Sequence, residues 1–125
     1  MTGRQDFAVN GPGRLLEDLN PAQREAVEAT TGPLVILAGA GTGKTRAISR
    51  RAAYAIETGA APADQILLVT FTEKAAREMA ARMAALGHPR VMARTFHSAA
   101  LAQLRHFWPL RHGEPLPATL DSKAR

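Results

Sequence analysis

The sequence predicts an α/β fold in which a parallel sheet is flanked by helices. Short apolar runs alternate along the chain with longer segments of helical periodicity, which is the order expected of strands joined by crossover helices. The runs are continuously apolar rather than alternating, as strands buried on both faces are. About three strands are expected, fewer than most complete α/β sheets contain, so the fold is predicted to be incomplete.

The first half of the chain is predicted to contain a leader, a helix, a strand and a second helix. Residues 1–14, rich in glycine and polar residues, are expected to form a flexible leader. A helix is expected over residues 20–29, because asparagine is a good N-cap and proline is tolerated at the first helical position. Residues 34–38 form the first predicted strand. The helix over residues 44–58 then ends before Gly59.

The second half repeats this alternation. Residues 65–70 are predicted to form a buried strand, and residues 73–86, rich in Ala, Met, Arg and Glu, a helix. Residues 91–95 are the third strand candidate. A last helix is expected over residues 97–108, with Pro109 ending it.

Composition and charge exclude several classes of protein. The chain has no cysteine, which rules out disulfides and thiolate metal sites, and no apolar run near the roughly 20 residues of a membrane span. No apolar signal core follows the N-terminus, so a cytoplasmic location is expected. The net charge of +5 lies in residues 70–125, which hold nine Lys and Arg against four Asp and Glu. This favours a polyanionic partner such as nucleic acid; the alternative is a solvated basic face.

A glycine-rich loop stands between the first predicted strand and the helix that follows it. Its glycines allow close approach of the backbone, and N–H groups of the loop and helix start can point at phosphate oxygens. Lys44 adds a positive charge near those phosphates and the Thr45 hydroxyl suits a Mg²⁺ ligand, so both are catalytic candidates. The alternative is a glycine-rich turn that happens to precede Lys-Thr. The loop comprises Ala38, where the strict pattern has glycine, and Gly39, Ala40, Gly41, Thr42, Gly43, Lys44 and Thr45.

Three further segments resemble motifs of one family. Residues 19–27 (LNPAQREAV) resemble an adenine-recognising Q motif, residues 68–79 (LVTFTEKAAREM) a motif Ia, and residues 94–98 (RTFHS) a motif Ib. In this order and spacing they are similar to the UvrD/Rep/PcrA helicases of superfamily 1A, which also prefer alanine at the position of Ala38. The resemblance implies a P-loop NTPase (RecA-like) fold. Residues 15–125 are then the N-terminal part of its ATP-binding domain, truncated before Walker B.

The resemblance also implies roles for residues near the loop. Gln23 is expected to recognise the adenine edge of ATP, since an amide offers both a donor and an acceptor. The alternative is a capping box, in which Gln23 reaches back to Asn20. Arg46 is a candidate contact to the nucleotide phosphates, and its alternative is a solvated helix charge.

A second group of residues is expected to contact DNA. Phe71 follows a strand at the carboxyl edge of the sheet, where ligands bind in open α/β folds, and an aromatic ring there can stack on a base; its alternative is core packing. Hydroxyl and amino groups can position the DNA backbone without reading sequence. The alternative for Lys74 is a solvent-facing helix charge. The predicted phosphate contacts are Thr70, Thr72, Lys74 and Thr95, and the predicted second single-strand contact is Phe96 with His97.

The activity implied for the intact protein is ATP-driven 3′→5′ translocation on single-stranded DNA and unwinding of duplex DNA, in DNA repair. Hydrolysis in this family needs a Walker B Asp-Glu pair and arginine fingers from a second domain. No such acidic pair follows an apolar run in this sequence, so the chain alone is expected to be an inactive N-terminal fragment. One alternative is a standalone nucleotide- or DNA-binding remnant. A small phosphate-loop kinase is the other, and single-stranded DNA would not stimulate it.

Overall fold

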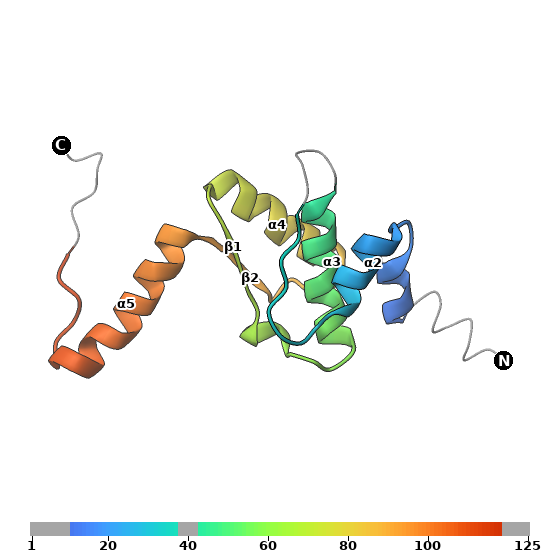
Figure 1. Cartoon of the computed structure of the whole chain (residues 1–125). Coiled ribbons are helices and arrows are strands. Elements are labelled where there is room, and N and C mark those ends of the chain that lie inside the picture. Colours follow the sequence, from blue (N-terminus) through green and yellow to red (C-terminus); the bar gives the residue numbers. More distant parts are fainter. Residues whose placement is uncertain (1–10, 38–42, 119–125) are drawn as a thin grey trace.

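Helices and two short parallel strands alternate in the computed structural model, which describes residues 11–37 and 43–118 (Figure 1). The described part begins with a 3-10 helix and a helix, continues with the helix after the glycine-rich loop, and ends with a strand-helix-strand unit followed by a long helix. In chain order the elements are η1 (Pro12–Leu16), α2 (Pro21–Glu28), α3 (Lys44–Glu57), η2 (Ala63–Gln65), β1 (Leu67–Thr70), α4 (Glu73–Ala85), β2 (Met92–Thr95) and α5 (Phe96–His112).

The two strands confirm the predicted parallel pairing. β1 and β2 lie side by side in parallel, with Leu67 opposite Met92 and Thr70 opposite Thr95. The helix α4 connects them, as a parallel pair requires. Because the strands are parallel and in register, both end at the same edge of the sheet. The segments that follow Thr70 and Thr95 therefore start next to each other.

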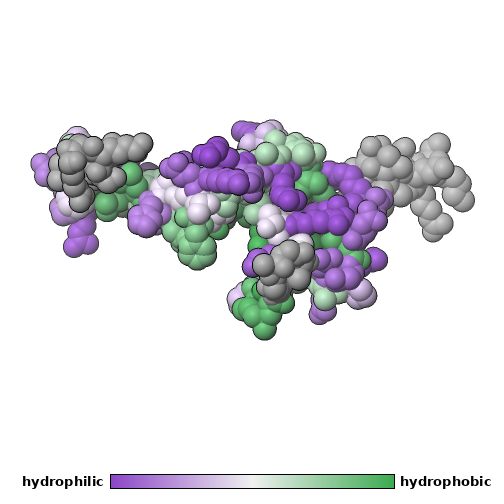
Figure 2. All heavy atoms as spheres, turned by 90° about the horizontal axis from the view of Figure 1, so that it is seen from above, coloured by the Kyte–Doolittle hydropathy of each residue, from purple (hydrophilic) through white to green (hydrophobic). Residues whose placement is uncertain are grey.

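The prediction of a strand over residues 34–38 is wrong for residues 34–37, the part of it that the structure describes. Residues 34–37 form no strand, and the side chains of Val35 and Leu37 are 80% and 93% exposed; Ala38 lies outside the described residues. An apolar run becomes a strand only when a neighbour completes its hydrogen-bond ladder. β1 pairs with β2, and no third strand pairs with them within residues 11–37 and 43–118. Apolar side chains consequently remain on the surface, among those drawn green in Figure 2.

This segment instead borders a cleft against α3 and β1. The cleft has a volume of about 420 Å³. Leu34 and Ile36 form one wall, and Ile48 of α3 and Ile66, next to β1, contribute to the rest. The run of residues 34–37 is thus close to the sheet without belonging to it.

The last helix is longer than predicted. α5 begins at Phe96 and continues through Pro109 to His112. Within a helix, proline removes one N–H donor and its ring crowds the carbonyl four residues earlier, but three further residues of α5 follow Pro109, so the predicted stop there is wrong. The helix ends at Gly113, whose backbone is left-handed (φ 71°) and whose N–H donates to the Pro109 carbonyl at 2.8 Å.

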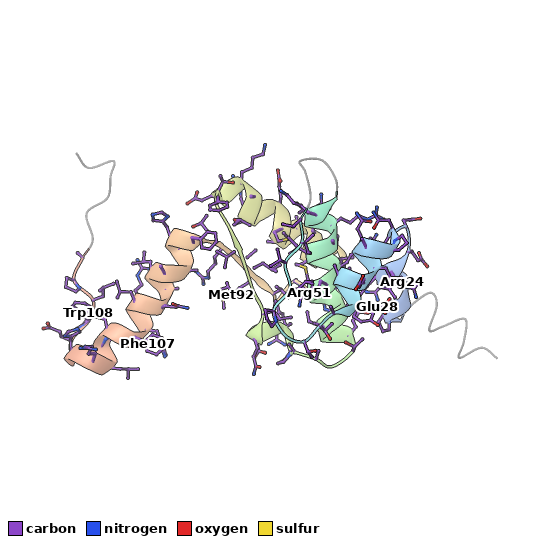
Figure 3. All side chains as sticks on the ribbon, viewed as in Figure 1. Arg24, Glu28, Arg51, Met92, Phe107 and Trp108 are labelled. Carbon is purple, nitrogen blue, oxygen red and sulfur yellow. The ribbon has the colours of Figure 1, made fainter. Side chains whose placement is uncertain are left out.

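α5 extends away from the other helices (Figure 1) and has no buried residue. Leu104, Phe107 and Leu110 are exposed on it. The Trp108 ring packs against His112 of the same helix, with ring centroids 4.0 Å apart, and not against the core (Figure 3).

The core lies between η1, α3 and the end of α4. Leu15, Ala52, Ala53, Met83 and Val91 are buried there together. The alanines of α3 let the neighbouring elements approach the helix axis closely. The predicted leader of residues 1–14 therefore overlaps a folded element, because Pro12–Leu16 forms η1; residues 1–10 lie outside the described residues.

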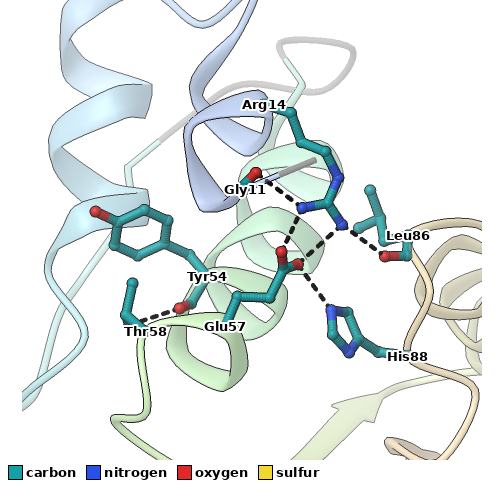
Figure 4. A network of polar contacts seen from close by, with 7 residues as sticks. All are labelled: Gly11, Arg14, Tyr54, Glu57, Thr58, Leu86 and His88. Carbon is teal, nitrogen blue, oxygen red and sulfur yellow. Dashed lines mark hydrogen bonds and ion pairs between the residues drawn. The ribbon is translucent and has the colours of Figure 1, made fainter. Parts of the chain in front are cut away.

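Two sets of polar contacts hold η1 and the end of α2 against this core. Arg14 of η1 forms an ion pair with Glu57 at the end of α3, and Glu57 also contacts His88 after α4 (Figure 4). On the other side, Arg51 of α3 donates from Nε to the Ala29 carbonyl at 2.8 Å. The segment before the glycine-rich loop is thereby fixed to the helix after it.

Candidate nucleotide and DNA site

The glycine-rich loop meets α3 at Gly43, which is the N-cap of that helix. Gly43 has a left-handed backbone (φ 82°, ψ 19°). Lys44 and Thr45 occupy the first turn and are exposed, whereas Ala47, one turn further, is buried. The first N–H groups of a helix have no acceptor within it and carry partial positive charge, which suits an anion. Of the predicted loop, Ala38, Gly39, Ala40, Gly41 and Thr42 lie outside the described residues.

Gln23 takes part in a capping box and also lies beside this loop end. Its backbone N–H donates to Asn20 Oδ1 at 2.8 Å, and its own Oε1 accepts from the Asn20 N–H at 3.1 Å. The capping alternative is therefore confirmed. A Cβ placed on Gly43 would lie 3.0 Å from Gln23 Nε2. The amide thus caps α2 with its oxygen while its nitrogen lies against the start of α3.

Arg46, on the same first turn of α3, faces the segment before α2. Its Nη2 lies 3.8 Å from Oδ2 of Asp18. Asp18 was not singled out in the sequence, and no local pattern marks it, because the pairing joins residues far apart in the chain. Arg46 thus forms an exposed ion pair with Asp18 in this structure.

Gly43→Ala is expected to weaken both folding and nucleotide binding. A left-handed alanine costs about 1–2 kcal/mol, and the new Cβ would press on Gln23 at 3.0 Å. Gly59→Ala is the matched control, since Gly59 has φ 80° but open space around its Cβ position. Thermal unfolding should show a loss in both variants, whereas titration with a fluorescent ATP analogue should show a loss only in Gly43→Ala. Equal nucleotide affinity in the two variants would contradict the role given to this glycine.

Two aromatic rings meet at the carboxyl edge of the sheet. Phe71 follows β1 and Phe96 follows β2, and their ring centroids lie 5.1 Å apart with the planes tilted by 41°. Phe71 is 89% exposed, so core packing does not explain it. An exposed aromatic pair on the surface can take a flat apolar ligand on its outer face.

The threonines beside this pair cap the two following helices. The Thr72 hydroxyl accepts from the Ala75 N–H, and the Thr95 hydroxyl accepts from the Ser98 N–H, both at 3.1 Å. A hydroxyl that accepts in a cap keeps its own proton for donation. Thr70 differs, because its hydroxyl donates to the Thr72 carbonyl at 3.0 Å.

Basic groups lie around the same edge. Lys74 is exposed on the first turn of α4, with Nζ 4.0 Å from Glu78, and His97 is exposed on the first turn of α5. Arg77 and Arg94, which the sequence did not assign to the site, line a cleft of about 400 Å³ between α4 and β2. The signal that pointed to them was the basic excess of the second half of the chain.

The described residues could bind the predicted Mg²⁺ ion only together with the phosphates of a nucleotide. No group of three or more His, Cys, Asp or Glu is clustered for metal binding among them. Mg²⁺ is usually held by one or two protein oxygens together with substrate phosphates and water, and the exposed Thr45 hydroxyl at the start of α3 suits that role. Within the same residues, no helix is long and apolar enough to cross a membrane.

Comparison with known proteins gives one consistent result. Residues 19–117 match the UvrD/REP helicase N-terminal domain. The chain is 47% identical over 117 residues to the ATP-dependent DNA helicase UvrD2 of Mycobacterium tuberculosis. It is 48% identical over 97 residues to UvrD1 of Mycobacterium leprae and 45% identical over 95 residues to PcrA of Bacillus subtilis. These matches cover 87%, 74% and 74% of this chain but only 17%, 12% and 13% of the relatives.

Proposed function

From its membership of the UvrD/REP helicase N-terminal domain family, we propose that this chain is the part of an ATP-dependent DNA helicase that binds ATP and contacts DNA. The proposal rests on one observation: the Gln23 side chain lies next to the start of α3, which contains Gly43, Lys44 and Thr45. Two segments far apart in the sequence, each expected to bind part of ATP, are adjacent in the fold.

On the nucleotide side, each group has a distinct task. The N–H groups at the start of α3 and the Lys44 ammonium hold the β- and γ-phosphates. The Thr45 hydroxyl serves as a ligand of the Mg²⁺ ion that accompanies ATP. The Gln23 amide reads the adenine edge, and its place in the α2 cap orients it for this. Mg²⁺ supplies charge neutralisation of the phosphates when it is bound.

On the DNA side, the aromatic pair takes one base of single-stranded DNA on the exposed face of Phe71. Phe96 backs that ring at 5.1 Å. The hydroxyls of Thr72 and Thr95, with Lys74 and His97, contact the sugar-phosphate backbone. Such contacts position the strand without selecting its sequence, as a motor that moves along any DNA requires.

We extend the proposal to the longer protein as follows. Residues 15–125 belong to the N-terminal part of its ATP-binding domain, together with the preceding residues of η1 (Pro12–Leu16) that pack on the same core. The Asp-Glu pair and arginine fingers needed for hydrolysis are contributed by other parts of that longer protein. The whole protein then moves 3′→5′ on single-stranded DNA and unwinds duplex DNA in cytoplasmic DNA repair.

Phe71→Ala is expected to weaken the binding of single-stranded DNA by roughly 5- to 30-fold, equivalent to about 1–2 kcal/mol of base stacking. Fluorescence anisotropy with a labelled oligothymidine measures this. Phe107→Ala is the matched control, because Phe107 is an exposed phenylalanine on α5 that is not part of the aromatic pair.

The affinity for single-stranded DNA should also fall as the salt concentration rises, since each phosphate contact releases a counterion. The salt dependence should persist in Phe71→Ala, which keeps the basic groups. Two results would count against the DNA site: equal affinity in Phe71→Ala and wild type, or affinity that does not change with salt.

A further inference from the structure

Two arginines from different elements line one cleft beside β2. Arg77 comes from α4 and Arg94 from β2, and the cleft between these elements has a volume of about 400 Å³. All four residues of β2 line the cleft, so both faces of the strand border it, whereas β1 contributes no residue. The cleft therefore follows the edge of β2 that does not pair with β1. Every residue that lines it belongs to the described part of the chain.

The positive charge in this cleft is not neutralised by the residues that surround it. Within residues 11–37 and 43–118, neither arginine forms an ion pair. Arg94 is half-buried, and its Nε donates to the thioether sulfur of Met92 at 3.3 Å, which is a weak acceptor. Glu73 also lines the cleft, one turn before Arg77, but forms no ion pair with either arginine. Because two cations that share a cleft repel each other, an anion bound there is stabilised by both.

One end of the cleft adjoins the aromatic pair of Phe71 and Phe96. Thr95 and Ser98 line the cleft, and Phe96 lies between them in the chain, at the start of α5. The Phe96 ring in turn lies 5.1 Å from the ring of Phe71. The cleft thus begins where the proposed base contact ends, which is where the backbone of a bound strand would continue.

We propose that Arg77 and Arg94 together bind one phosphate of single-stranded DNA, next to the base that stacks on Phe71. The inference rests on the proposed function, because it takes Phe71 as the base contact. A guanidinium suits this role, since its planar set of N–H donors matches the oxygens of a phosphate. The contact fixes the path of the strand past α4 without selecting its sequence. DNA fits the cleft better than an acidic protein segment does, because the exposed aromatic pair beside it suits a base.

Removing either arginine should weaken DNA binding, and removing both should also change its salt dependence. Arg77→Gln and Arg94→Gln are each expected to lower the affinity for a labelled oligothymidine about two- to fivefold, the size of an exposed charge contact. The double variant loses one phosphate contact, so the slope of log affinity against log salt should become less steep by about 0.7. Arg82→Gln is the matched control, because Arg82 is exposed on α4 but does not line the cleft.

A change of opposite sign should follow from removing the carboxylate that lines the cleft. Glu73→Gln takes away a negative charge that repels phosphate, so the affinity for oligothymidine should rise about twofold. Damage to the fold cannot produce such a gain, so this variant decides the matter even if Arg94→Gln is unstable. Glu114→Gln is the control, because Glu114 is exposed beyond the end of α5; it should leave the affinity unchanged.

The experiment is fluorescence anisotropy of the 125-residue chain with oligothymidine between about 50 and 200 mM salt. If the wild type does not bind, or if Phe71→Ala binds equally, the proposed DNA site fails and this inference with it. If Phe71→Ala binds more weakly but the arginine variants and Glu73→Gln match their controls, only the role of the cleft is overturned. Binding of poly-glutamate that needs both arginines, with oligothymidine binding unaffected by them, would assign the cleft to an acidic protein segment and also overturn the inference.

Discussion

Lys44→Ala is expected to lower ATP turnover by at least about 100-fold in the longer helicase proposed above, as removal of one preorganised charge-stabilising group does in other enzymes. Lys44 stands exposed on the first turn of α3, beside the N-cap Gly43. In the site proposed above, its ammonium stabilises the negative charge that develops on the transferred phosphoryl group. Phosphate release in the presence of single-stranded DNA is the measurement.

The control for Lys44→Ala is Arg105→Ala, which removes one exposed cation from α5. It should leave turnover within about a factor of two, the range of ordinary surface substitutions. Near-normal turnover in Lys44→Ala would exclude the phosphate-loop assignment. The 125-residue chain alone should show no turnover above background. Lys44-dependent hydrolysis by that chain would show that it needs no further domain.

The helices could be predicted closely because their ends are determined by local chemistry. α2 begins after Asn20, as its cap and first-turn proline indicate, and α3 ends one residue before the predicted Thr58. α4 ends at Ala85, near the predicted stop at Gly87. Such signals act within one turn of the residue that carries them.

The first strand and the last helix end were predicted wrongly because neither depends on local chemistry alone. Residues 34–37 have the apolar content of a strand, but they lie across a cleft from β1 and form no ladder with it, and an apolar run becomes a strand only when such a ladder forms. α5 passes through Pro109 because the helix is already long when the proline occurs. A neighbour in the sheet and the accumulated stability of a helix are properties of the fold, so sequence patterns represent them poorly.

In the candidate site, too, some features could be predicted from the sequence and others could not. Phe71 and Phe96 could each be placed after a strand from the sequence, and the parallel register of β1 and β2 brings their rings together. The pairing of Asp18 with Arg46 could not be predicted, because it depends on how η1 and α2 pack on α3. The clustering of Arg77 and Arg94 in one cleft likewise depends on the packing of α4 against β2.

The second large effect is expected at Glu57, which joins three parts of the core. Its carboxylate accepts from Arg14 of η1 and contacts His88 Nε2 at 2.8 Å (Figure 4). Arg14 also donates to the carbonyls of Gly11 at 3.0 Å and Leu86 at 3.1 Å. The hydrogen bond to Glu57 raises the pKa of Arg14. Glu57 thus links η1, the end of α3 and the segment after α4.

Glu57→Ala is expected to lower the free energy of unfolding by roughly 2–3 kcal/mol, somewhat less than the loss for a fully buried pair. The substitution leaves the Arg14 guanidinium partly buried without its counterion. Glu28→Ala is the control, because Glu28 forms an exposed ion pair with Arg24 at 2.8 Å; its loss should stay within about 0.5 kcal/mol. Urea denaturation of the 125-residue chain measures both, and equal losses would show that the Glu57 contacts add nothing beyond a surface pair.

The Glu57 contribution should also depend on pH in a defined direction. Burial opposes ionisation of this carboxyl, but the hydrogen bonds and charges of Arg14 and His88 outweigh it and hold the pKa of Glu57 below its ordinary value of 4.5. The unfolded chain therefore takes up the proton first as the pH falls. The stabilisation is complete above pH 4.5 and is lost as the pH drops through the lower value of the folded state. The stability difference between wild type and Glu57→Gln should accordingly shrink as the pH falls below 4.5. A difference that stays constant into acid would mean that the charge of Glu57 does not stabilise the fold.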